Sequence, residues 1–75
     1  MNLERDSQER GLRMLLRQIE IFLRETGMPW TRFGRLAAHD PRFVGDLRNG
    51  RMPRADTQER IERFMRAWKE KTDAN

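Results

Sequence analysis

The chain contains no cysteine and only one histidine among its 75 residues. Without cysteine it can form neither a disulfide nor a thiolate metal site, a composition that fits a reducing cytoplasm. The single histidine, His39, has no second metal ligand at motif spacing, and we interpret it as a turn residue. A phosphate-cradling glycine loop and a nucleophile paired with a base are also missing from the sequence. We therefore predict no enzymatic activity, no catalytic residue, no metal site and no cofactor.

Long apolar runs are absent too. The N-terminal stretch MNLERDSQER begins with charged residues instead of the apolar run of a signal peptide. No window approaches the roughly 18 apolar residues of a membrane span, so we expect a soluble, cytoplasmic protein without membrane association. A chain of 75 residues can bury only one small core, with about 60% of its unfolded surface removed from water. We expect a single domain over residues 1–75 with frayed ends at 1–6 and 71–75.

The positive charge is concentrated in one part of the chain. The formal net charge is +4, from 16 Lys and Arg against 12 Asp and Glu. Residues 1–27 carry five basic and five acidic groups, and residues 55–75 carry five of each, so both segments are neutral. Residues 28–54 carry six arginines against two aspartates, which accounts for the whole excess. A local basic segment rich in arginine favours a polyanion as partner, because guanidinium groups contact phosphates and guanine edges in a planar, multidentate way.

Apolar residues at helical spacing predict a longer helix near each end of the chain. The first spans residues 8–26, with Ser7 or Asp6 as its front cap. The last spans residues 56–69, where an Asp followed three residues later by a Glu resembles a capping box. Its apolar stripe includes Trp68, which we assign either to the core or to a dimer interface.

Two short helices are predicted between them, over residues 30–38 and 41–49. Asp40 is a good N-cap for the second, and the proline after it costs no hydrogen bond at the first helical position. In the first short helix, the expected apolar contacts are Phe33, Leu36 and Ala37. Together the four segments predict an all-α fold, a compact bundle of four main helices.

The spacing within residues 41–49 assigns each side chain to a face. Phe43, Val44 and Leu47 share one side and are expected in the core. For Phe43 this is favoured over contact with a thymine methyl group. The opposite, exposed face then carries Arg42, Gly45, Asp46 and Asn49.

Two short helices joined by a tight turn, the second ending in Asn49-Gly50-Arg51 with Pro53 soon after, resemble the helix-turn-helix of the Cro and phage-repressor-like (XRE-like) family. The resemblance covers about residues 28–53, with the family's further helices before and after, and therefore most of the chain. Phe33-Gly34 occupies the place of the family's leucine-alanine pair, and Leu47 matches its buried aliphatic residue. The arrangement FGRLAAHDPRFVGDLRNGRMP is also similar to small helix-turn-helix proteins of alphaproteobacteria.

This sequence departs from the family pattern at two places. Pro29 replaces the usual polar cap before the first helix of the motif, and Ala38 and His39 stand near the position of the usual turn glycine. Histidine enters the left-handed backbone region more readily than most non-glycine residues, so we expect the turn to form.

The resemblance implies a sequence-specific DNA-binding transcriptional regulator, a repressor that binds a promoter or operator and is nucleoid-associated when bound to double-stranded DNA. Residues 41–49 would be its recognition helix, lying in the major groove. Because one recognition helix reads only a few base pairs, we expect a homodimer on a pseudo-palindromic site.

Within this interpretation the exposed face of residues 41–49 contacts bases. Arg42 can bond guanine O6 and N7 together. Asp46, one turn later, could hold Arg42 in place or accept a bond from cytosine, and Gly45 would let the helix approach the groove closely. Asn49 could touch a base or a phosphate. Phosphate contacts, which supply affinity and salt dependence, are expected from Trp30, Arg32, Arg35, Arg51 and Arg54.

Other interpretations stay open for several of these residues. Asp46 could pair with Arg42 on the surface without touching DNA. Trp30 could pack against the first helix. Arg48 is off the exposed stripe, which favours a surface or intrachain role. The whole chain could instead be a protein-binding adaptor with RNA polymerase or a toxin as partner, because a fold does not dictate its use. An antitoxin, a phage-encoded inhibitor and an RNA polymerase cofactor are examples of that class.

Overall fold

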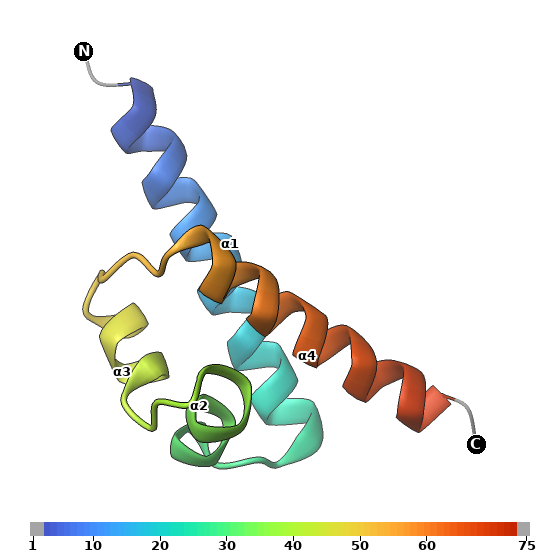
Figure 1. The fold of residues 1–75 in the computed structure, drawn as a ribbon. Helices are drawn as coiled ribbons and strands as arrows, with labels where there is room; N and C mark the ends of the chain where they lie inside the picture. The colour runs from blue at the N-terminus through green and yellow to red at the C-terminus, as the bar shows by residue number, and fades with distance from the viewer. Residues whose placement is uncertain (1–2, 74–75) are drawn as a thin grey trace.

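A computed structural model describes the backbone of residues 3–73 and the side chains of residues 10–71. This part of the chain forms α1 (Leu3–Thr26), α2 (Trp30–Ala38), α3 (Phe43–Arg48) and α4 (Ala55–Asp73), and it contains no strand. The predicted all-α fold of four main helices is therefore confirmed. The long helices α1 and α4 project in opposite directions from a small globule in which α2 and α3 also lie (Figure 1), which gives the molecule extents of 49 × 23 × 21 Å.

The long helices extend further than the sequence predicts. α1 begins at Leu3, upstream of both residues expected to cap it, and α4 continues to Asp73. Of the ends expected to fray, residues 3–6 and 71–73 are helical, while residues 1–2 and 74–75 lie outside the described part of the chain. The extensions contain no glycine or proline and consist mostly of good helix formers, so nothing in them stops the helix.

The second short helix is shorter than predicted, because its first two residues form a turn. The Asp40 side chain accepts a hydrogen bond from the Arg42 amide at 2.9 Å, and the Asp40 carbonyl accepts one from the Phe43 amide at 3.1 Å. The prediction of Asp40 as the helix N-cap is therefore wrong: its side chain closes the turn before α3, and the N-cap is Arg42, which makes no side-chain capping bond. Regular helix begins only at Phe43.

The turn between α2 and α3 depends on the backbone conformation of His39 and on the absence of a side chain at Gly34. His39 ends α2 in the left-handed region at φ 56°, as its place in the sequence predicts. The next amide, that of Asp40, donates to the Gly34 carbonyl at 3.0 Å. This brings the Asp40 backbone so close to α2 that a Cβ atom at Gly34 would collide with the Asp40 carbonyl oxygen. Only glycine at position 34 permits this approach.

The core draws on all four helices and on the α1–α2 connection. Its buried side chains are Leu15, Ile19, Phe22, Met28, Phe33, Ala37, Phe43, Val44, Leu47 and Ile61. Four aromatic rings, those of Phe22, Phe33, Phe64 and Trp68, tie α1, α2 and α4 together with centroid separations from 5.3 to 6.1 Å. The expected core contact of Leu36 is wrong: the side chain is 46% exposed. Helical geometry places it about a quarter turn away from the face shared by Phe33, Gly34 and Ala37.

Replacing Gly34 by alanine tests the close approach at the turn. Because the added methyl group would meet backbone atoms, which cannot rotate away, we expect Gly34→Ala to lower the free energy of unfolding by about 1–3 kcal/mol. Gly11→Ala is the matched control, since a Cβ atom there meets nothing within 4 Å. That substitution should raise stability by up to about 1 kcal/mol through helix propensity. Urea unfolding followed by circular dichroism measures both, and equal effects of the two substitutions would contradict the packing argument.

Candidate nucleic-acid interface

The exposed side of α3 is set by what its other side buries. Phe43, Val44 and Leu47 are 7%, 0% and 2% exposed, so the prediction that they form the core side is confirmed. Arg42 and Asn49, one at each end of the helix on the opposite side, are exposed. Among the side chains that the structure describes, no ion pair engages Arg42. Its guanidinium is therefore available for a partner outside the chain.

Gly45, in the middle of this exposed side, is covered by an aromatic ring from α2. A Cβ atom at Gly45 would lie 3.3 Å from Cζ3 of Trp30, the first residue of α2. The glycine thus makes room for the indole, and this contact gives a reason for a small residue that the sequence alone did not reveal. The Trp30 ring remains 40% exposed and becomes part of the α3 surface.

Arg48 connects this surface to α1. Its Nε donates a hydrogen bond of 2.8 Å to Oε1 of Glu20, 28 residues away in the chain. Its guanidinium carbon also lies 5.6 Å from the centroid of the Trp30 ring, a distance at which a cation and an aromatic face attract. The predicted intrachain role of Arg48 is confirmed. Trp30, Arg48 and Glu20 thus link the N-terminus of α2, the flank of α3 and the C-terminal half of α1.

The electrostatics of this link favour the charged forms of both partners. The hydrogen bond from Arg48 lowers the pKa of the Glu20 carboxyl, partial desolvation opposes that change, and the charges of Arg48 and Arg24 reinforce it. The same hydrogen bond raises the pKa of Arg48, against a smaller effect of desolvation. Both side chains are more than a third exposed, so the interaction is screened by water and is modest in energy.

Asp46 lies on the other flank of α3 and pairs with a residue that the sequence did not suggest. Its Oδ2 is 3.6 Å from Nη1 of Arg51, and its carbonyl accepts a hydrogen bond from the Arg51 amide at 2.9 Å. The proposed pairing of Asp46 with Arg42 is therefore wrong in this structure. The chain reverses after Gly50, which has φ 87°, and this reversal brings Arg51 back beside the helix.

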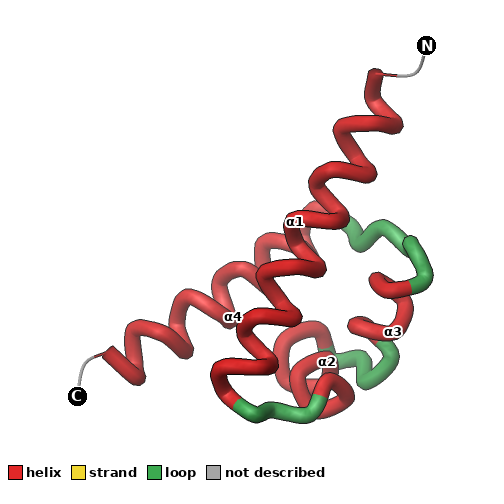
Figure 2. Tube along the Cα trace, turned by 180° about the vertical axis from the view of Figure 1, so that it is seen from behind, coloured by secondary structure: helices red, strands yellow, loops and turns green. Residues whose placement is uncertain are grey.

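The remaining expected phosphate ligands lie on the elements before and after α3. Arg32 and Arg35 are exposed on α2, on the side of that helix opposite Phe33 and Ala37. Arg51 and Arg54 are exposed in the loop that joins α3 to α4 (Figure 2). The fold thus places arginines on the elements before and after α3.

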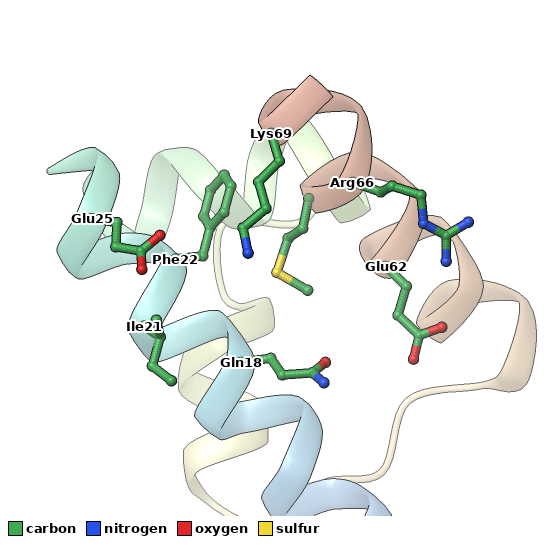
Figure 3. Close-up of a pocket in the computed structure, with 8 residues that line it drawn as sticks. Gln18, Ile21, Phe22, Glu25, Glu62, Arg66 and Lys69 are labelled. Carbon is green, nitrogen blue, oxygen red and sulfur yellow. The ribbon is translucent and has the colours of Figure 1, made fainter. Parts of the chain in front are cut away.

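A groove of about 570 Å³ lies elsewhere, between α1 and α4. Figure 3 shows Gln18, Ile21, Phe22 and Glu25 on the α1 side and Glu62, Arg66 and Lys69 on the α4 side. Ile21 is 43% exposed. The groove therefore combines apolar surface with charges of both signs, a composition suited to a protein partner.

The described residues contain neither a metal-ligand cluster nor a membrane-spanning helix. No group of three or more His, Asp or Glu side chains is arranged to hold a metal ion in this part of the chain. No helix there has the length and apolar composition that crossing a bilayer requires.

The chain was also compared with known proteins. No family model matches it, and neither does any curated protein or solved structure. The case for a function therefore depends on the geometry and charges of the chain itself.

A double-mutant cycle on Glu20 and Arg48 measures the link between α1 and α3. Because the folded-state pKa of Glu20 is lowered, the pair stabilises the fold above the ordinary glutamate pKa and loses this effect as the pH falls through the folded-state value. We expect Glu20→Gln and Arg48→Gln to show a coupling of about 0.2–1 kcal/mol at pH 7 and low salt. Urea unfolding of the four proteins at pH 7 and at pH 3 tests this, and a coupling that does not weaken as the pH falls would contradict it.

Proposed function

We propose that this chain binds double-stranded DNA with sequence preference and acts as a transcriptional regulator, a repressor at a promoter or operator. The observation that carries the proposal is the exposed side of α3, where Arg42 stands outside any ion pair of the described side chains. Further exposed arginines lie on α2 and in the α3–α4 loop. A helix that offers a guanidinium at its start is suited to the major groove, where arginine bonds guanine O6 and N7. In this role the protein works at the nucleoid, in the cytoplasm.

The residues around α3 take different parts in this proposal. Arg42 and Asn49 contact bases near the two ends of the helix, on either side of the covered Gly45. Trp30 lies over that glycine, so its ring meets the wall of the groove near a phosphate. Asp46 acts indirectly: by pairing with Arg51 it holds that arginine beside α3. Arg32, Arg35 and Arg54 then contribute phosphate contacts without base preference.

The proposed DNA-bound form is a homodimer on a pseudo-palindromic site, since one helix of this length reads few base pairs. The groove between α1 and α4 is the surface that supports it, because apolar side chains are exposed there and charges of both signs line its rims. The same surface favours a second candidate function, that of an adaptor which binds another protein such as RNA polymerase or a toxin. A monomer that binds no duplex yet captures such a protein tightly would favour the adaptor.

Selection of bound sequences from a random duplex pool at moderate salt tests the DNA proposal. Wild-type protein should enrich a two-fold-symmetric site. Arg42→Ala should relax the preference at one position in each half-site and weaken binding to the selected site by about 1–3 kcal/mol, because a bidentate guanine contact is lost.

Arg63→Ala is the control, since Arg63 is exposed on α4, away from α3, and its removal changes the net charge equally. It should leave the selected sequence unchanged and weaken binding little. Enrichment of no sequence by the wild type, or an equal loss with both variants, would rule out base reading through Arg42.

A further inference from the structure

Four arginines of α1 lie along one exposed face of the helix. Arg10, Arg13, Arg17 and Arg24 are separated by three, four and seven residues, so they share a side. All four are exposed. The buried residues of α1, namely Leu15, Ile19 and Phe22, point in the opposite direction. We call this set of four the arginine stripe.

Among the described side chains, the acidic residues of α1 compensate the arginine stripe only in part: the hydrogen bond from Arg48 lowers the pKa of Glu20 most, and the charge of Arg24 also helps to lower it. Glu20 is hydrogen-bonded to Arg48 of α3, and Glu25 lines the α1–α4 groove (Figure 3). No ion pair involving the four arginines occurs among the described side chains. Like charges three and four residues apart destabilise a free helix. A stripe of like charges without such ion pairs is stabilised when it binds a polyanion.

The arginine stripe lies beside the α3 surface. Arg17 and Arg24 are three residues before and four residues after Glu20, which Arg48 attaches to the flank of α3. Arg17 and Arg24 of the arginine stripe therefore lie next to the place where α3 contacts α1. In Figures 1 and 2 the N-terminal half of α1 projects past α3 and the loop after it, whereas α4 projects the other way. The N-terminal half of α1 therefore extends beyond the surface that α3 offers to a partner.

We propose that the arginine stripe binds backbone phosphates of the same duplex, outside the base pairs that α3 reads. From Arg10 to Arg24 the helix rises by about 21 Å, which matches about six base pairs at 3.4 Å each. An anionic membrane fits less well, because a membrane-bound helix must insert an apolar face and that face of α1 is in the core. This inference rests on the proposed DNA-binding function and enlarges its binding site.

The test compares two double variants with equal change of charge. Arg13→Gln with Arg17→Gln removes the centre of the arginine stripe. Arg60→Gln with Arg63→Gln removes two exposed arginines of α4, where acidic residues alternate with basic ones. Glutamine is a good helix former, so both helices should persist, and circular dichroism checks this. The probe is a duplex of about 40 base pairs that carries the selected site at its centre, or random sequence if none is selected.

Binding is measured at several salt concentrations, together with hydroxyl-radical footprints. In the stripe variant we expect the slope of log K against log salt to become shallower by about 0.9 per lost contact, or about 1.8 per protomer. Protection should disappear from the flanking backbone and persist over the α3 site, with the selected sequence unchanged. The α4 variant should keep the wild-type slope and footprint. If the double variant fails to fold, the single variants should each reduce the slope by about 0.9.

The outcomes separate this inference from the proposal on which it rests. Wild-type protein that binds duplex DNA, with a stripe variant that matches the α4 variant in slope and footprint, overturns the arginine stripe as a phosphate contact and leaves α3 recognition standing. Wild-type protein that does not bind duplex DNA at low salt overturns both. Loss of sequence preference in the stripe variant, with its flanking protection intact, also contradicts the assignment to backbone phosphates.

Discussion

The close approach of the Asp40 backbone to Gly34 sets the position of α3 and therefore the side chains that α3 exposes. It requires a residue without a side chain on α2 and a left-handed residue, His39, directly after that helix. Where these two conditions hold, the chain reverses tightly enough for Phe43, Val44 and Leu47 to enter the core beside Phe33. Because these three side chains face the core, Arg42 and Asn49 on the opposite side of α3 face solvent. Packing on one side of a six-residue helix therefore decides which groups are offered on the other.

A helix of this length is not stable by itself, because the cost of nucleation is not recovered within two turns. Contacts on the two flanks of α3 help to stabilise it in the folded chain. On one flank Trp30 covers Gly45 and Arg48 reaches Glu20, and on the other Asp46 pairs with Arg51. These contacts hold the helix on three neighbouring elements. They also divide its exposed side, so that the groups available to a partner stand at its two ends.

Charge is distributed differently along the chain and over the surface. Counted along the sequence, the first 27 residues are neutral and the excess lies in the middle segment. In the folded chain, Glu20 turns toward α3 and Glu25 toward the α1–α4 groove, which leaves Arg10, Arg13, Arg17 and Arg24 together on the outer face. Neutrality of a segment therefore says little about the field at one of its faces. The helical period, applied to charged as well as apolar residues, was the signal in the sequence that could have revealed the stripe.

The four helices and their order, the core side of α3 and the left-handed turn at His39 could all be predicted from the sequence, because each follows from spacing or from the preference of one residue. The sequence also located the excess positive charge in residues 28–54 and placed Arg48 off the exposed face of residues 41–49. Helix ends were less certain, since the polar segments at both ends contain nothing that stops a helix. The pairing of Asp46 with Arg51, the contact of Gly45 with Trp30 and the hydrogen bond of Glu20 with Arg48 became visible in the folded chain alone. These contacts join residues from different elements, or across a chain reversal, and their geometry exists only after the core has set the helices against one another.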